Sequence, residues 1–183
     1  MISYMESLSQ RKSKRPNMQK LLMKRVKYAK KIIREGFNSP FLILDSQETD
    51  LGVSVSFWKG KKRVGLNLKK GYYTIYRKVN NRYECLYVGK TDQSIYHRVN
   101  RWAKGVAGRL RPDENHAAAT RARLDGVRLT DQLYIKYVDQ DAVNRIIDDA
   151  SIRCEPLDEW IAPLLKSKYN RRTFNVGLEP FFK

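Results

Sequence analysis

The sequence is short of cysteine, of acidic residues and of long apolar runs, and each shortage excludes a class of protein. The 183 residues include only two cysteines, Cys85 and Cys154, whose separation fits neither a disulfide framework nor a metal-ligand pattern. We therefore expect both to be reduced and structural. The N-terminus is charged every few residues, so neither a signal peptide nor a membrane span is expected. These absences predict a soluble protein of the cytoplasm.

The shortage of acidic residues points to the partner. Lys and Arg total 37 against 19 Asp and Glu, which gives a formal net charge of +18. Such an excess repels itself unless a polyanion neutralises it, so nucleic acid is the leading partner. A basic surface without a ligand and a ribosome-associated protein are the alternatives. Apolar residues still make up 42% of the chain, which is enough for a core and predicts one domain with an appendage.

The appendage is predicted to be residues 1–70, a basic helical arm followed by a β-hairpin that together bind DNA. Apolar residues recur at helical spacing over 17–35, and Gly36 is a stop signal. Because the lysines and arginines fall mostly on other faces, we expect this helix to pack on the core and to offer a phosphate-binding face. Alternating residues then predict a hairpin within 41–68. Its basic tip at 59–62 can enter a DNA groove or simply face solvent.

Residues 71–183 alternate strands and helices, and their order predicts a small α/β core. The predicted elements are a hairpin of 72–79 with 83–88 turning at Asn80-Asn81, helices over 92–104 and 112–124, a strand over 133–138, and a helix from Ala142 to the Pro156 region. This order predicts a three-stranded mixed or antiparallel sheet flanked by helices.

Two motifs in this core carry a resemblance to a known family. Gly-Tyr-Tyr-Thr-Ile-Tyr at residues 71–76 is followed, after the turn, by Tyr-Val-Gly-Lys at 87–90 and by a helix with Arg98. Together they resemble the GIY-YIG nuclease superfamily, which includes homing endonucleases, some restriction enzymes and the nuclease domain of a bacterial excision-repair subunit. The likeness covers about residues 71 to 177. It implies a metal-dependent DNA endonuclease of the stand-alone restriction or phage type, in the cytoplasm of a bacterial or phage-infected cell.

The resemblance assigns a role to two tyrosines. A tyrosine hydroxyl beside a metal-bound water can relay or accept its proton. A turn centred at residues 80–81 places Tyr73 nearly opposite Tyr87 across the hairpin. Tyr76 is the alternative to Tyr73, because its separation from Tyr87 also matches the family. Gly71 precedes Tyr73 at the right offset, so Tyr73 is preferred.

The catalytic arginine of the family corresponds to Arg98, which lies eleven residues past Tyr87. A guanidinium can bind the scissile phosphate with two hydrogen bonds and offset the charge of the transition state. Arg101, one turn on, is the alternative. Trp102 departs from the family, many members of which have His or Tyr there. His116 is expected to be structural or to contact DNA at a helix end.

The resemblance further implies a single glutamate that binds Mg²⁺ or Mn²⁺, because a hard cation needs few protein oxygens. Glu159 is preferred, with Glu155 as the alternative. Phe174-Asn175 resembles the family's terminal aromatic-Asn pair, in which Asn175 helps to order the site; Asn170 is its alternative. The expected partner is DNA, on which two copies can pair as a homodimer. A non-catalytic nucleic-acid-binding protein on the same scaffold is the second hypothesis.

Overall fold

The protein is built around one six-stranded sheet. The structure, a computed structural model, describes residues 18–37, 39–153 and 156–170. The strands are β1 (Leu42–Thr49), β2 (Gly52–Lys59), β3 (Lys62–Arg63), β4 (Gly71–Val79), β5 (Arg82–Thr91) and β6 (Leu133–Asp139). They lie in the order β3-β2-β1-β6-β4-β5, and every neighbouring pair is antiparallel. The α/β class is confirmed, whereas the sheet has six strands in place of the three predicted.

The three additional strands come from the predicted extension. β2 pairs with β3 through the basic turn, as predicted, but β3 has only two residues. The long partner of β2 is β1, which also pairs with β6 through Leu42, Ile43 and Leu44. Only Leu42 and Leu44 of β1 are buried, so its alternating pattern is too short to predict a strand. The extension therefore continues the sheet of the predicted core.

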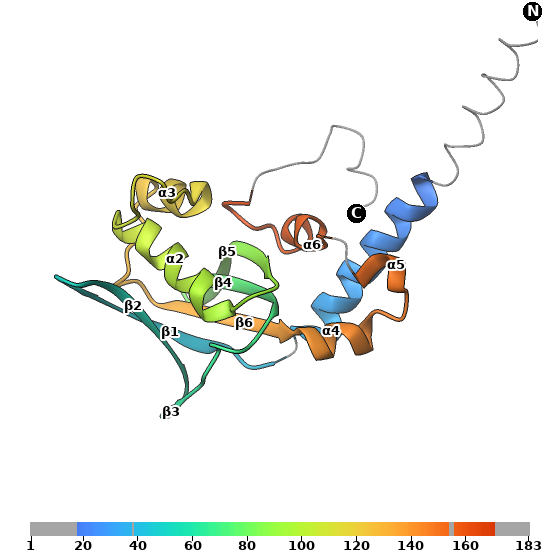
Figure 1. Cartoon of the computed structure of the whole chain (residues 1–183), viewed down its shortest axis with the longest axis horizontal. Helices are drawn as coiled ribbons and strands as arrows, with labels where there is room; N and C mark the ends of the chain where they lie inside the picture. Colours follow the sequence, from blue (N-terminus) through green and yellow to red (C-terminus); the bar gives the residue numbers. More distant parts are fainter. Residues whose placement is uncertain (1–17, 38, 154–155, 171–183) are drawn as a thin grey trace, which may run out of the picture.

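One face of the sheet is covered by α2 (Ile95–Ala107), with α3 (Ala117–Leu124) beside it (Figure 1). The α2 helix begins after Ser94, whose hydroxyl accepts a hydrogen bond from the backbone N–H of His97. The helices approach closely at Gly105, where a Cβ atom would lie 2.5 Å from the Cβ of Ala119. Val99 and Trp102 of α2 are fully buried in the first core between this helix and the sheet.

The second core lies between the other face of the sheet and a group of helices that come from both ends of the described chain (Figure 1). They are a helix over residues 18–31, its π-helical continuation η1 (Ile32–Gly36), α4 (Gln140–Ile146), α5 (Ala150–Arg153) and α6 (Asp158–Leu164). The basic helix ends at Gly36 as predicted. The single helix predicted after Ala142 is instead two short helices. Within the described residues, none of the helices is long and apolar enough to cross a membrane.

The segment after α6 runs along β5, the last strand of the sheet. The backbone N–H groups of Lys168 and Tyr169 donate to the carbonyls of Cys85 and Leu86. The Asn170 amide then bonds both backbone groups of Val88, donating to its carbonyl at 2.7 Å and accepting from its N–H at 2.8 Å. These bonds hold Asn170 beside β5.

Candidate active site

A β-bulge in the β4–β5 hairpin puts Tyr73 and Tyr87 on the same face of the sheet. The hairpin turns at residues 80–81, as predicted, and both residues have the positive φ that suits a two-residue hairpin turn. The register shifts by one residue after Ile75, because Leu86 is an additional residue in β5. A shift of one residue reverses the face to which a side chain points. Without the bulge, Tyr87 would therefore point away from Tyr73.

The predicted pairing of Tyr73 with Tyr87 is wrong by two residues, one of which is due to the bulge. Tyr73 lies opposite Gly89, and its hydroxyl would be 2.6 Å from a Cβ atom at that position. Tyr87 is the diagonal neighbour, with ring centroids 6.1 Å apart, and the two hydroxyls interact. Tyr76 points to the other face, into the second core. Of Tyr73 and Tyr76, only Tyr73 therefore lies beside Tyr87.

Both phenols are protonated at neutral pH. Tyr73 is only 1% exposed, and burial raises its pKa well above the ordinary value; Tyr87 raises it further and Arg98 opposes the shift. Burial likewise raises the pKa of Tyr87, with Asp158 adding to the shift and Arg98 again opposing it. The pair can therefore donate hydrogen bonds and pass protons on, but neither member is a phenolate.

A cleft of about 600 Å³ opens beside this pair, and three of the predicted residues line it: Tyr87, Arg98 and Glu159. They come from β5, α2 and α6, which are distant in sequence. Tyr73 lies behind Tyr87 and does not line the cleft. The remaining lining residues are Asn115, His116, Ala117, Ala118, Arg121, Tyr169 and Asn170.

The walls of the cleft favour an anion. Arg98 and Arg121 contribute two guanidinium groups. Ala117 and Ala118 form the first turn of α3, where backbone N–H groups and the helix dipole attract phosphate. Glu159 is the one carboxylate in the lining. This combination suits a phosphodiester together with a cation.

His116 takes part in the wall as the N-cap of α3. Its Nδ1 accepts a hydrogen bond from the N–H of Ala119 at 3.3 Å, so Nε2 carries the proton of the neutral ring. Burial lowers its pKa to about 4, and Arg101 and Arg98 contribute to this shift. The ring meets Tyr87 edge to face, with centroids 5.2 Å apart. The structural role predicted for His116 is confirmed, and the neutral imidazole is also a hydrogen-bond donor at the cleft.

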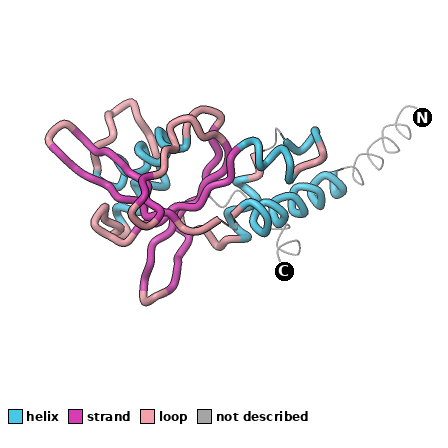
Figure 2. The backbone as a smooth tube through the Cα atoms, turned by 90° about the horizontal axis from the view of Figure 1, so that it is seen from below, coloured by secondary structure: helices cyan, strands magenta, loops and turns pink. Residues whose placement is uncertain are grey.

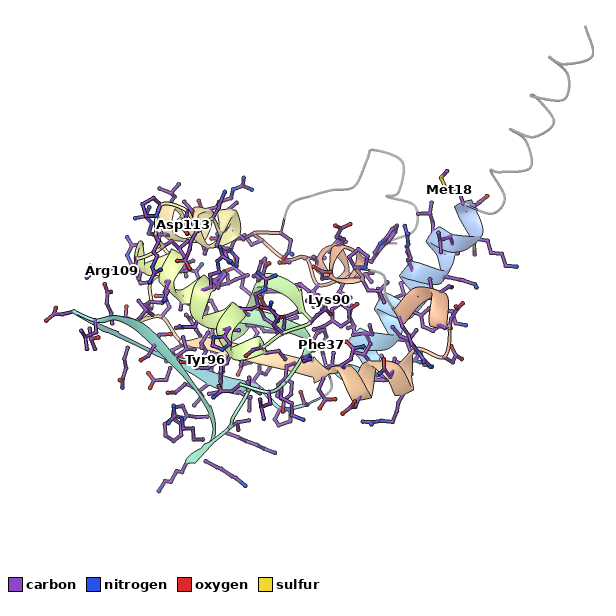
Figure 3. All side chains as sticks on the ribbon, viewed as in Figure 1. Met18, Phe37, Lys90, Tyr96, Arg109 and Asp113 are labelled. Carbon is purple, nitrogen blue, oxygen red and sulfur yellow. The ribbon has the colours of Figure 1, made fainter. Side chains whose placement is uncertain are left out.

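Sequence reasoning missed Asp158, a carboxylate in the first turn of α6. One of its carboxylate oxygens is buried without a hydrogen-bond partner, and burial raises its pKa. It interacts electrostatically with both Tyr73 and Tyr87, while Lys90 opposes the shift in its own pKa. Figure 3 shows Lys90 on the side of the sheet near α6. Only the three-dimensional packing of α6 distinguishes this carboxylate from its neighbour in sequence.

Of the remaining predicted residues that the structure describes, only one lies at the cleft. Trp102 is fully buried in the first core, and Arg101 is not among the residues that line the cleft. Asn170 lines the cleft, fixed by its bonds to Val88. Asn175, like Glu155, lies outside the described residues.

The fit of a metal ion depends on Glu159. Among the described residues, no group of three or more His, Cys, Asp or Glu side chains is placed to bind one ion. Mg²⁺, however, commonly binds to one or two carboxylates and keeps several waters. Glu159 is exposed in the cleft, so its carboxylate fits Mg²⁺ or Mn²⁺ held in this way.

Comparison with known proteins gave no relatives. No family model matches the chain, and no match was found among curated proteins or solved structures. The likeness to GIY-YIG nucleases therefore stays a prediction from the sequence motifs of this chain.

Proposed function

We propose that the protein is a metal-dependent DNA endonuclease with a site of the GIY-YIG kind. One observation carries the proposal: Tyr87, Arg98 and Glu159 come from three separate elements and line the same cleft, with Tyr73 directly behind Tyr87. A structural role alone gives no reason for a phenol, a guanidinium and a carboxylate to share a solvent-accessible wall.

Arg98 and the N-terminus of α3 hold the phosphate of the substrate. The guanidinium offsets the negative charge that develops on the phosphate oxygens in the transition state. Arg121 and the Nε2–H of His116 are further donors on the same wall. Bound at Glu159, Mg²⁺ or Mn²⁺ would supply Lewis-acid stabilisation of the same oxygens.

The two phenols move the proton of the attacking water. As the water oxygen bonds to phosphorus and the P–O bond of the leaving group breaks, Tyr87 accepts the water proton and passes its own to Tyr73, which gives up its own proton to Asp158, while the leaving oxygen takes a proton from the solvent of the cleft. We assign Asp158 to the end of this relay because its carboxylate interacts electrostatically with both phenols; burial also raises its pKa, which makes it a better base. Since the phenols are protonated in the resting site, each acts by exchanging a proton rather than as a phenolate.

Two basic surfaces outside the cleft support DNA as the substrate. A groove of about 530 Å³ runs along the helix over 18–31 and η1, with Lys27, Lys30, Lys31 and Arg34 in its walls. The β2–β3 turn carries Lys59, Lys61 and Lys62, all exposed. Lysine and arginine side chains of this kind neutralise backbone phosphates without reading the sequence.

The test is cleavage of supercoiled plasmid in Mg²⁺ or Mn²⁺, with DNA binding measured in parallel. Arg98→Ala and Glu159→Gln are expected to lower the cleavage rate by about 100-fold or more, while Glu159→Gln still shifts DNA in a gel. Arg145→Ala and Asp50→Asn, which remove exposed charges outside the cleft, serve as matched controls. Cleavage that persists unchanged in Arg98→Ala and Glu159→Gln would overturn the proposal.

The second candidate function is nucleic-acid binding without cleavage. It is favoured by Trp102, which is buried in the core and offers no acid or base four residues after Arg98. DNA binding by the unaltered protein, with no cutting in either metal, would establish this candidate and exclude the nuclease.

A further inference from the structure

The sheet has a face that is partly open to solvent, opposite to the face that carries Tyr73. Along β1, Leu42 and Leu44 point into the first core, whereas Ile43 between them points the other way and is 44% exposed. α2 lies on the side of the first core. Seen from below, the strands are nearer to the viewer than α2 (Figure 2).

Aromatic side chains cross this open face from strand to strand. Residues directly opposite each other in an antiparallel sheet point to the same side. One such row crosses all six strands: Arg63, Trp58, Ile43, Tyr134, Tyr76 and Cys85. Adjacent strands lie about 4.8 Å apart, so the row is about 24 Å long. Trp58, Ile43 and Tyr134 are its accessible centre.

At one end of the row the aromatic rings form a stack. Phe41 lies parallel to Tyr83, with centroids 3.9 Å apart and an interplanar angle of 10°. Tyr134 meets Tyr83 edge to face at 5.1 Å. Tyr83 is nevertheless 42% exposed. A large aromatic side chain that stays so accessible while its neighbours pack is available to a flat ligand.

Cations accompany the aromatic residues on this face. Arg63 lies opposite Trp58, and Lys78 lies opposite Tyr83. The ammonium group of Lys136 is 4.4 Å from the centroid of Phe41. Among residues 18–37, 39–153 and 156–170, no acidic side chain forms an ion pair with any of these three cations. The Lys136 ammonium group already donates to the Phe37 carbonyl at 2.9 Å, so the face presents flat apolar rings beside the positive charges of Arg63 and Lys78, which have no counter-ion in that part of the chain.

We propose that this outer sheet face (Phe41, Ile43, Trp58, Tyr83 and Tyr134) binds single-stranded nucleic acid by stacking bases on its aromatic rings. The rings match the π-faces of bases, and the cations match the phosphates between them. A duplex is a poor occupant, because its bases are already stacked on one another. The binding is separate from the proposed cleavage, because none of these five residues lines the cleft.

The test compares two probes of equal charge, a (dT)12 oligonucleotide and an abasic 12-mer, in EDTA so that neither is cleaved. Bases that stack on aromatic residues strengthen binding by about tenfold each. We therefore expect (dT)12 to bind at least tenfold more tightly than the abasic strand. It should also quench tryptophan fluorescence, because Trp58 is the accessible tryptophan while Trp102 and Trp160 are buried.

Substitutions identify the residues that cause the preference for (dT)12. Trp58→Ser and Tyr83→Ser are expected to reduce the preference for (dT)12 towards one, whereas Leu68→Ser, at an apolar residue that is almost fully exposed elsewhere, leaves it unchanged. Lys78→Ala should lower the affinity for both probes by the same factor. Urea midpoints identify a misfolded variant. Lys78→Ala and Trp58→Ser leave the rings of Phe41 and Tyr83 in place, so they test the proposal even if Tyr83→Ser does not fold.

Three outcomes would overturn the proposal. Equal affinity for the two probes would mean that charge alone binds them. A preference for (dT)12 that survives in both serine variants would place the stacking elsewhere. A dimer that sedimentation detects in the unaltered protein and not in the serine variants, without (dT)12 binding, would make this face a subunit interface.

Discussion

At the scale of single residues, the site depends on a close fit between Tyr73 and Gly89. The phenol of Tyr73 lies where any side chain at residue 89 would be. Glycine is therefore required at residue 89 by the tyrosine across the hairpin, although its own φ is ordinary. This contact holds the Tyr73 ring beside Tyr87.

Gly89→Ala is expected to destabilise the protein by about 1–3 kcal/mol, because a buried aromatic ring has to move to admit the methyl group. Urea unfolding measures the change. Gly65→Ala is the matched control, since a Cβ atom there meets nothing within 4 Å. Equal effects of the two substitutions would show that the Tyr73 contact is not responsible.

His116 makes stability depend on pH. Its pKa is about 4 in the folded protein and about 6.5 in the unfolded chain, so only the unfolded chain takes up the proton between these values. Stability is complete above pH 6.5 and decreases as the pH falls towards 4. His116→Asn keeps an N-cap without this titration. Between pH 7 and pH 5 the unaltered protein should lose on the order of 1–2 kcal/mol more than the variant in urea unfolding; parallel curves would contradict this.

The resemblance to a known family implied that Tyr87, Arg98 and Glu159 are neighbours, and all three line the same cleft. It did not indicate Asp158 or the place of His116 in the cleft. Asp158 differs from Glu159 only in which side of α6 it occupies, and His116 reaches Tyr87 through the packing of α3 on α2. Such proximity depends on helix docking, which no local pattern encodes.

At the scale of elements, contacts between distant segments override local preferences. The helix predicted after Ala142 stops at Ile146. The two aspartates that follow are bound by the basic helix: Tyr28 bonds to Asp148, and Lys24 pairs with Asp149 at 2.7 Å. The bulge at Leu86 is likewise invisible in the alternating pattern. Strand and helix existence was therefore predictable in this core, whereas register and helix breaks were not.

Asn170 fastens the segment after α6 to β5. Asn170→Ala removes three hydrogen bonds, one of them donated by the Ser167 hydroxyl, and leaves the N–H and C=O groups of Val88 unpaired, which is expected to cost about 1–3 kcal/mol. Hydrogen exchange of the Val88 amide should accelerate accordingly. Asn144→Ala, on the exposed surface of α4, is the control and should leave that amide unchanged. Unaltered exchange in Asn170→Ala would contradict the assigned role.

At the scale of the whole molecule, the charge predicts how DNA binding responds to salt. If about six phosphates are contacted, duplex affinity should fall by about a thousandfold between 50 and 200 mM salt. Replacing Lys27, Lys30 and Lys31 by alanine should reduce the slope of log affinity against log salt by up to about three, and Arg145→Ala by less than one. A slope that the triple variant leaves unchanged would exclude the groove along the basic helix as a contact.

The bonding of residues 167–170 to β5 also governs self-association. An unpaired strand is a template on which a second sheet can grow. In the described chain, residues 85–88 of β5 are shielded by this segment. At the opposite limit of the sheet, β3 pairs only with Trp58 and Lys59, so residues 52–56 of β2 have no partner among the described strands on that side. Two copies can therefore join their sheets through β2, whereas the shielded part of β5 is closed to such pairing.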